Sequence, residues 1–410
     1  MHIALIVDDY LPSAKSAALM MHQLAAGIAA AGHEATLMTP SASVPGLLDA
    51  SRTDGFTLLR FRSGRVKNVN KPLRCVNESL LSLRLLHAAK KHDFGRVDLI
   101  AFYSPSIFWG PAVKALKRRF GCGAFLILRD IFPKWVVDQK MLSPLSPIYA
   151  YFKLFERISY SAADAIGVQA APDFKYLETQ NCSHASLSVF PNWCQPETLR
   201  PKHASGAWRQ RLGLGGKTIF FFGGNLGKAQ DMDNIVRLTA NLKSSPEAHF
   251  LLVGKGDEYE SIASKKAKLA LDNITLLPAV QPEEYFDMLA EADVGIFSLH
   301  PSRRGQDMPG KILGYLSCGK PVLGSANPEN NVKELLNSSR VGLTTWNPDD
   351  EGFAANARRL LNPALRAELG RNALELLNRR FSVNAAVNKL LQTAAKMQAA
   401  KATTEPQRAS

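Results

Sequence analysis

Short apolar strands alternate with helices along this chain, and the alternation starts twice. In the first half, strands are predicted at residues 2–7, 34–38, 99–103, 124–128, 165–168 and 187–190. In the second half they are predicted at residues 218–222, 249–253, 274–277, 294–297 and 321–323. Strands that are apolar throughout and separated by helices are typical of parallel sheets covered on both faces. The sequence therefore predicts an α/β protein with two Rossmann-like, doubly wound parallel-sheet domains in series.

The turn formers at residues 191–196 separate the two patterns. We expect an N-terminal domain over residues 1–195, a C-terminal domain over 196–382 and a final helix over 383–398 that crosses back to the first domain. Residues 399–410 are polar and lack bulky apolar side chains, so a disordered tail is expected. Two such domains face each other across a cleft, at the carboxyl ends of their strands, where ligands of these sheets bind.

A glycine-rich loop, Gly223-Gly224-Asn225-Leu226-Gly227-Lys228, follows the first strand of the second pattern. Glycines let the backbone approach a phosphate closely, and the following helix supplies N–H groups. The loop is neither Gly-x-Gly-x-x-Gly nor a Walker loop. Alone it is also typical of an ordinary turn.

Residues 307–325 read as a helix start, a short helix that stops at Gly319, and a buried strand. Lys311 falls in the first turn, where the helix dipole disfavours a cation. A lysine there indicates an anionic ligand, although a surface lysine on an ordinary αβ unit is equally compatible. Lys228 and Lys311 could converge on one diphosphate.

Several polar groups lie at predicted strand ends. Asp8-Asp9 could orient an acceptor hydroxyl or merely end a strand. Residues 129–135 begin with Arg129 and suit a sugar or phosphate contact, or an Arg–Asp pair that shapes the loop. Asp231-Met232-Asp233 has a metal-binding spacing, but acidic residues at a helix start are more often caps. Ser104 and His300 lack a nucleophile elbow, which argues against a hydrolase triad.

The formal net charge of +14 is concentrated in residues 60–91, where nine residues are basic and only Glu78 is acidic. The basic residues are Arg60, Arg62, Arg65, Lys67, Lys71, Arg74, Arg84, Lys90 and Lys91. Nucleic acid, an anionic membrane surface and phosphorylated substrates are candidate partners. Leucines and a valine recur there at helical spacing, so this segment either lies on a membrane or turns its apolar stripe to the core.

Five scattered cysteines without a Cys-x-x-Cys pair favour reduced thiols and a cytoplasmic protein. The first residues have the pattern of a strand and are followed directly by Asp8 and Asp9, so no signal peptide is expected.

Taken together, these motifs resemble the GT-B retaining glycosyltransferases of family four. The resemblance covers nearly the whole chain. It rests on the glycine loop, Leu252-Val253-Gly254-Lys255-Gly256-Asp257, Ala292-Asp293-Val294-Gly295-Ile296, and the Pro309-Gly310-Lys311 and Cys318-Gly319-Lys320-Pro321-Val322 segments. Residues 8–12, 128–133 and 223–227 look most like bacterial transferases of O-antigen and capsule assembly, some of which handle N-acetyl-fucosamine.

The resemblance implies a nucleotide-sugar donor, UDP-linked, held by the C-terminal domain, with the base beside residues 277–280. It implies catalytic roles for Lys228, Lys311, Asp9 and Arg129. The expected donor-binding residues are Gly223, Gly224, Asn225, Gly254, Pro278, Ala279, Val280, Met308, Pro309, Gly310 and Ile312. No metal and no cofactor are expected, since the nucleotide sugar is a substrate. The acceptor would face the N-terminal domain and would be lipid-linked or a glycan. It would be reached by a peripheral protein on the inner face of the cytoplasmic membrane, with no nucleic-acid partner.

The sequence departs from the family pattern in three places. The two glutamates that commonly precede the Cys-Gly-x-Pro-Val segment are replaced by Gln306 and Gly314. The family's Arg/Lys pair aligns with Asn225 and Gln230 of this chain. Many family members carry a histidine after the strand equivalent to residues 99–103, where this chain has Ser104. A catalytically altered GT-B protein, a UDP-sugar 2-epimerase and a basic nucleic-acid-binding protein therefore remain alternatives.

Overall fold

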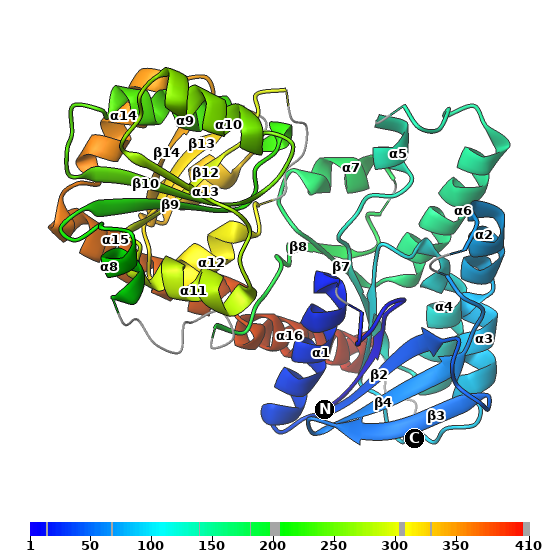
Figure 1. The fold of residues 1–410 in the computed structure, drawn as a ribbon. Coiled ribbons are helices and arrows are strands. Elements are labelled where there is room, and N and C mark those ends of the chain that lie inside the picture. Colours follow the sequence, from blue (N-terminus) through cyan, green and yellow to red (C-terminus); the bar gives the residue numbers. More distant parts are fainter. Residues whose placement is uncertain are drawn as a thin grey trace. The chain divides into compact units, whose positions relative to one another are not determined.

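The computed structural model describes residues 1–13, 15–66, 69–138, 140–180, 182–196, 206–302, 308–328 and 330–404. Lys67, Gln306 and Asp307, which the sequence singled out, lie outside these ranges. The chain divides into two compact units (Figure 1). Unit 1 comprises Met1–Trp193 and Val383–Ser410, and unit 2 comprises Cys194–Ser382.

Unit 1 is built on a sheet with the strand order β3-β4-β2-β1-β5-β6-β7-β8. Only the edge strand β3 is antiparallel to its neighbour. The strands are β1 (His2–Ile6), β2 (Glu34–Ser41), β3 (Leu48–Thr53), β4 (Phe56–Arg62), β5 (Leu99–Tyr103), β6 (Gly123–Ile127), β7 (Ala165–Val168) and β8 (Ser186–Val189). The six predicted strands of the first half are all present.

The hairpin of β3 and β4 was not predicted from the sequence. Its turn is Asp54-Gly55, with φ values of 44° and 82°, and an Asp-Gly pair between two strands is a strong hairpin signal. Most of β3 is exposed, so the strand lacks the apolar run on which the other predictions depended.

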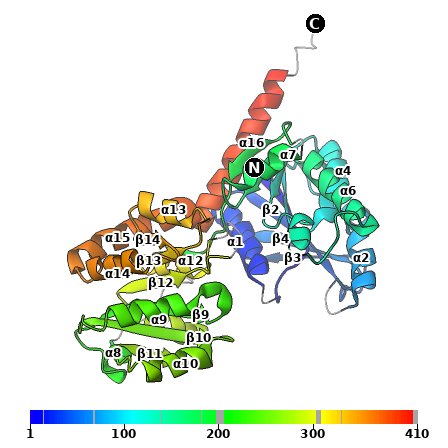
Figure 2. The ribbon, with the colours of Figure 1, turned by 90° about the horizontal axis from the view of Figure 1, so that it is seen from above.

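Helices cover both faces of the unit 1 sheet. They are α1 (Ser16–Ala30), α2 (Lys71–Ser79), α3 (Leu81–Ala89), α4 (Gly110–Phe120), α5 (Lys134–Asp138), α6 (Pro147–Ala162), α7 (Asp173–Thr179) and α16 (Val383–Thr404). One core cluster joins the sheet to α3, α4, α6 and α7, and the other joins it to α1 and α16. Figure 2 shows α16 beside the sheet of unit 1.

The α1–α16 contact is close because Gly27 has no side chain. A Cβ at this position would lie 2.5 Å from Val383 Cγ1. The last helix also runs further than predicted and ends at Thr404 rather than at residue 398. Alanines favour this extension, and Lys401 Nζ donates a hydrogen bond to the carbonyl of Gly121 (2.8 Å). The prediction of disorder from residue 399 is therefore wrong up to Thr404; residues 405–410 lie outside the described part of the chain.

Unit 2 has a fully parallel sheet with the order β11-β10-β9-β12-β13-β14. Its strands are β9 (Thr218–Asn225), β10 (Ala248–Lys255), β11 (Ile274–Leu277), β12 (Val294–Ser298), β13 (Val322–Ala326) and β14 (Gly342–Trp346). The five predicted strands are confirmed, and β14 was not predicted. The fold class, two parallel-sheet α/β domains, is therefore confirmed.

In unit 2, α9, α10 and α14 cover one face of the sheet, while α11, α12 and α13 lie on the other (Figure 1). The helices are α8 (Ala207–Arg211), α9 (Met232–Asn241), α10 (Tyr259–Lys268), α11 (Pro282–Glu291), α12 (Lys311–Ser317), α13 (Val332–Ser338), α14 (Asp350–Arg359) and α15 (Pro363–Leu376). Among the helices that the structure describes in both units, none has the length and hydropathy to cross a bilayer.

Candidate functional site

The glycine loop of unit 2 lies at the carboxyl end of β9, beside the end of β10. Gly224 pairs with Gly254 across the two strands, and a Cβ on Gly254 would lie 1.8 Å from the Gly224 carbonyl oxygen. Gly224 itself has a φ of +118°, which L side chains rarely adopt. A Cβ on Gly223 would lie 2.2 Å from Cε2 of Tyr285. Gly254 is therefore required by the close approach of the two strands, Gly224 by its backbone conformation, and Gly223 by the packing of the Tyr285 ring.

A cavity of about 290 Å³ opens at this edge of the sheet, where β9, β10 and β11 end. Its lining residues are Gly224, Asn225, Val253, Gly254, Lys255, Ala279, Val280 and Tyr285. Five of these were predicted donor-binding residues, and the structure brings them together from the ends of β9 and β10 and from the loop after β11. Pro278 precedes Ala279 and is exposed, but it does not line the cavity.

Tyr285 and Lys255 line the cavity but were not predicted as site residues. Lys255 stands next to Gly254, inside the motif of residues 252–257. Tyr285 lies on α11, and nothing in the local sequence distinguishes it from a core tyrosine. Burial raises the pKa of its phenol, so the group is neutral and acts through its ring.

Lys311 begins α12 and reaches back toward the end of β9. Its Nζ donates a hydrogen bond to Oε1 of Gln230 (3.1 Å) and lies 3.4 Å from the centroid of the Phe222 ring, within cation–π range. Gln230 belongs to a short 3₁₀ helix, Lys228–Gln230. Lys228 starts this turn and is exposed. Both predicted lysines thus border the segment that follows the glycine loop.

The residues around Lys311 have different surroundings. Met308 is half-buried, Pro309 is buried and Gly310 is exposed. The side chain of Ile312 is fully buried in the core of unit 2, and its N–H donates to the carbonyl of Pro309 (3.0 Å). Ile312 therefore anchors the helix start and has no side-chain atom to offer a ligand.

Gly314 is buried against α11. A Cβ at this position would lie 3.6 Å from Leu289 Cδ2 and 3.8 Å from Phe286 Cε1, in ordinary van der Waals contact. A methyl group would fit here. Gly314, which the resemblance aligns with a family glutamate, is therefore held against apolar side chains.

The two aspartates of Asp231-Met232-Asp233 have separate structural partners. Asp231 Oδ2 accepts a hydrogen bond from Asn347 Nδ2 (2.8 Å), which connects the start of α9 to the loop after β14. Asp233 forms an ion pair with Lys265 of α10. The pair thus ties together neighbouring elements of unit 2.

Arg129 is buried in unit 1. Its guanidinium donates to the carbonyl oxygens of Phe190 and Pro191 and stacks near the rings of Phe190 and Trp193. Burial lowers its pKa to about 10. This arginine caps the end of β8. The predicted contact with a sugar or phosphate has no support in this geometry.

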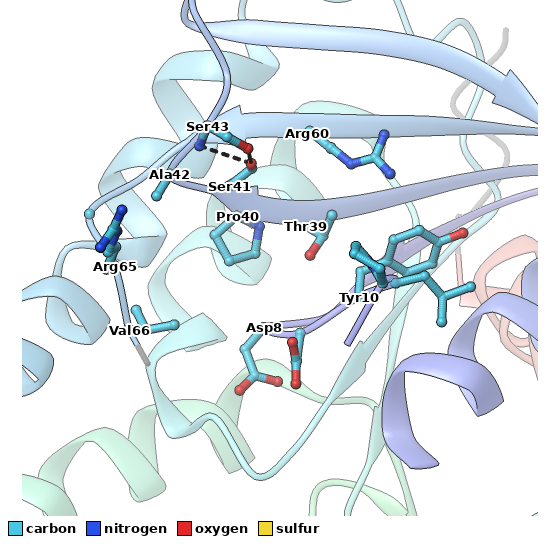
Figure 3. A pocket seen from close by; sticks show the side chains of 14 residues that line it. Asp8, Tyr10, Thr39, Pro40, Ser41, Ala42, Ser43, Arg60, Arg65 and Val66 are labelled. Carbon is cyan, nitrogen blue, oxygen red and sulfur yellow. Dashed lines mark hydrogen bonds between the residues drawn. The ribbon is translucent and has the colours of Figure 1, made fainter. Parts of the chain in front are cut away.

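Asp9 lies in the other unit, in the loop that follows β1. Its Oδ2 accepts a hydrogen bond from Ser13 Oγ (2.9 Å) and lies 3.7 Å from Lys15 Nζ. Together with Asp8 it lines a second cavity, of about 270 Å³ (Figure 3). Ser104 and His300, weighed as a nucleophile and base, belong to different units.

Comparison with known proteins gives a consistent result. Residues 216–363 match the family model for glycosyl transferases group 1. The probable glycosyltransferase WbjE of Pseudomonas aeruginosa is 23% identical over 238 residues, which are 57% of this chain and 58% of the relative. The putative colanic acid biosynthesis glycosyl transferase WcaI of Escherichia coli is 22% identical over 279 residues, 64% of this chain and 66% of that protein. The chain thus spans less than two thirds of each relative.

Solved structures match over almost the whole chain. Sucrose-phosphate synthase from Thermosynechococcus elongatus aligns with a TM-score of 0.65 at 19% identity, covering 97% of this chain and 99% of the other. HepE of Anabaena, in complex with UDP, aligns with a TM-score of 0.65 at 15% identity, covering 97% and 100%. At such identities the likeness establishes the fold, which is GT-B. Residues 216–363 are thus similar to glycosyl transferases group 1, and the chain as a whole has the GT-B fold.

Proposed function

We propose that the chain is a retaining glycosyltransferase of cell-surface polysaccharide assembly. Its donor is a UDP-linked sugar, an N-acetylated hexosamine or deoxyhexosamine, and its acceptor is a lipid-linked sugar or glycan. The observation that carries the proposal is the cavity at the ends of β9, β10 and β11, with the ammonium of Lys311 at the neighbouring segment. HepE, a structural neighbour, was solved with UDP, which supports the choice of base.

The cavity combines two surfaces that a nucleoside diphosphate requires. Val253, Val280 and Tyr285 provide apolar and aromatic area for a flat base. Gly224 is exposed and a Cβ there would meet nothing within 4 Å, so phosphate oxygens can approach its backbone. We assign the base to the side of Ala279 and Val280 and the diphosphate to the glycine loop.

Lys311 supports the assignment of the diphosphate because of where its charge lies. The resemblance places a family lysine at Gln230, and this chain has a neutral amide there. The Lys311 ammonium, which comes from a different element, is hydrogen-bonded to that amide. A positive charge is thereby restored next to the glycine loop.

The proposed reaction needs no side-chain nucleophile. The bond between the anomeric carbon and the diphosphate oxygen breaks, while the acceptor hydroxyl bonds to that carbon from the same face. The hydroxyl proton passes to an oxygen of the departing diphosphate. Lys311, Lys228 and the N–H groups of the glycine loop stabilise the negative charge that develops on the diphosphate.

A screen of nucleotide sugars tests the donor site. The full chain is incubated with UDP-, GDP- and ADP-sugars, and binding is followed by thermal shift and native mass spectrometry. We expect the UDP compounds to raise the melting temperature most, by ligand linkage. Absence of binding to every nucleotide would overturn the proposal. Epimerised UDP-sugar formed without any acceptor would favour the 2-epimerase instead.

The surface of unit 1 supports a lipid-linked acceptor. Twelve large apolar side chains are exposed in the described part of the chain, and nine of them belong to α2, α3, α5, α6 and the loop before α6. These nine, the apolar patch, are Leu73, Val76, Leu83, Trp135, Met141, Leu145, Ile148, Tyr151 and Leu154. The hydroxyls of Ser79 and Tyr151 lie 2.5 Å apart and join α2 to α6.

The charges around the apolar patch favour an anionic bilayer. Residues 71–91 and 134–157 contain nine lysines and arginines but three acidic residues, and each acid is paired with a base of its own helix. Trp135 and Tyr151 belong to a chain of aromatic contacts through Phe132 and Phe152. Partly exposed aromatic rings with flanking cations are typical of membrane–water interfaces.

Replacing two leucines of the apolar patch by aspartate should release the protein from vesicles. Leu145 is 93% exposed and Leu154 is 55% exposed, so the fold does not depend on either side chain. We expect the Leu145→Asp, Leu154→Asp variant to bind vesicles of phosphatidylglycerol and phosphatidylcholine at least about tenfold more weakly. Co-sedimentation measures this.

Leu269→Asp is the matched control, because Leu269 is an exposed leucine of unit 2. It should leave sedimentation unchanged. Equal binding of the wild type to vesicles of phosphatidylcholine alone, or a double variant that still sediments, would contradict the membrane role.

A further inference from the structure

Three side chains with hydroxyl groups form a row across the carboxyl ends of β12, β13 and β14 in unit 2. Ser298 pairs with Ser325, and Ser325 pairs with Thr345, in the parallel register of these strands. Side chains at paired positions lie on the same face of a sheet. Ile296 and Leu323, which precede the row by two residues, belong to the core under α9 and α14. The hydroxyl row therefore faces α9 and α14.

Two asparagines continue the hydroxyl row on the same face. Asn327 follows Ser325 by two residues, and Asn347 follows Thr345 by two residues, so the same order of residue types closes both strands. All four side chains are buried, since Ser325 and Asn327 are 0% exposed, Asn347 is 1% exposed and Thr345 is 8% exposed. A polar group of this kind between a sheet and its covering helices requires partners for its oxygen atoms.

Three oxygen atoms of this group have no hydrogen-bond partner among the residues that the structure describes. They are Oγ of Ser325, Oγ1 of Thr345 and Oδ1 of Asn347. The Nδ2 group of Asn347 is fully used, because it donates to Oδ2 of Asp231 (2.8 Å) and to the carbonyl of Leu299 (2.9 Å). A buried oxygen without a partner is rare and unfavourable. Three of them at neighbouring positions indicate a bound ligand.

One carboxylate beside the hydroxyl row has no basic partner. Asp231 accepts a hydrogen bond from Asn347 and forms no ion pair with any residue in the described ranges, whereas Asp350 is paired with Arg237. Ser298 donates its own proton to the carbonyl of Asp231 (3.5 Å). The group thus offers hydroxyl, amide, carbonyl and carboxylate oxygens together with one negative charge that is not balanced by a neighbouring base.

We propose that this group binds a monovalent cation, Na⁺ or K⁺. Oxygen atoms of Ser325, Thr345 and Asn347 coordinate it, and Asp231 supplies the balancing charge. Paired strands lie about 4.8 Å apart, so a cation between the two paired hydroxyls is about 2.4 Å or slightly more from each oxygen, a distance typical of oxygen ligands.

The set of ligands favours a single positive charge. Calcium sites commonly use several carboxylates, whereas only Asp231 lacks a base here. In the described part of the chain, no group of three or more His, Cys, Asp or Glu side chains could hold a metal ion. Neutral oxygens with one carboxylate are therefore better matched to a monovalent ion than to a divalent one.

The cation site is separate from the cavity at the ends of β9, β10 and β11, whose lining includes none of its residues. It lies close to that cavity in sequence, because Asp231 directly follows Gln230, to which Lys311 is hydrogen-bonded. A cation that fixes Asp231 and Asn347 therefore also fixes the start of α9. The proposal does not depend on the proposed function, since it concerns the folded chain without a donor.

Thermal unfolding of the full chain in different chloride salts tests the cation site. Melting temperatures are measured by calorimetry in potassium chloride, sodium chloride and choline chloride at one concentration, so that the anion and the ionic strength stay constant. Choline is too large for a buried site. We expect potassium or sodium to raise the melting temperature by about 3 °C or more above that in choline chloride, by ligand linkage. The larger shift identifies the ion.

The Thr345→Val variant should lose this shift. Valine keeps the shape of threonine, and removing a buried hydroxyl that has no partner should not lower the melting temperature in choline chloride. Thr344→Val is the matched control, because Thr344 is the adjacent buried threonine of β14 and its Oγ1 also has no partner among the described residues. Its side chain lies on the opposite face of the sheet, so this variant should keep the full shift.

Equal melting temperatures of the wild type in the three salts would overturn the proposal and leave water as the occupant. A Thr345→Val protein that keeps the shift, or an equal loss in the Thr344→Val protein, would also overturn it. Crystals grown with thallium(I) acetate locate the ion directly. We expect an anomalous peak between Ser325 and Thr345, and absence of a peak there would contradict the site.

Discussion

Lys311→Ala should lower the rate of sugar transfer by about a hundredfold or more while the protein stays folded. Removing one preorganised group that stabilises developing negative charge typically has an effect of this size. The Lys311 ammonium also contacts the Phe222 ring and Gln230. Because Lys311 is only half-buried, the loss of these contacts should change the melting temperature little. Steady-state assays with a UDP-sugar measure kcat and KM separately.

Lys333→Ala is the control for this variant. Lys333 is also a lysine of unit 2 stacked on an aromatic ring, with its Nζ 4.5 Å from the centroid of Trp346. Its contact is with the end of β14, three strands away from β9 in the sheet. Equal turnover of the Lys311→Ala and Lys333→Ala variants would show that Lys311 does not stabilise the diphosphate.

Gly254→Ala should abolish donor binding and lower the free energy of unfolding by about 3 kcal/mol or more. The added Cβ would lie 1.8 Å from the Gly224 carbonyl oxygen. The added Cβ and the carbonyl oxygen are both attached to the backbone of paired strands, so no side-chain rotation relieves the overlap. The ends of β9 and β10 must separate, and overpacking at such a site is strongly destabilising. Urea unfolding and UDP titration follow the two effects.

Gly215→Ala separates this effect from the general effect of replacing a glycine. A Cβ at Gly215 would meet nothing within 4 Å. The free energy of unfolding of the Gly215→Ala variant should therefore stay within about 0.5 kcal/mol of that of the wild type. A Gly254→Ala protein with normal unfolding and normal UDP affinity would show that the close approach of the two strands is unnecessary.

The architecture was predictable because parallel strands are covered on both faces and therefore apolar throughout. The same rule explains what was missed. β3 is an exposed edge strand, and β14 contains Thr344 and Thr345, so neither shows a continuous apolar run. The Asp54-Gly55 pair carried a usable hairpin signal that periodicity alone did not reveal.

The site was predictable where backbone requirements select the residue type. Gly224 and Gly254 stand where a left-handed conformation or a close strand approach excludes a side chain. Tyr285 could not be found in this way, because its place at the cavity depends on how α11 packs against Gly223. Arg129 shows the converse: an arginine that binds a phosphate and one that caps buried carbonyls look identical in sequence, and only the fold separates them.

The contact between α1 and α16 has a consequence for biosynthesis. The core on that face of unit 1 includes Val383, Val387 and Leu390, which are translated after the whole of unit 2. During synthesis, residues 1–193 therefore leave the ribosome with an apolar face still uncovered, while residues 194–382 already contain all of their own core. Maturation of unit 1 must therefore wait for α16.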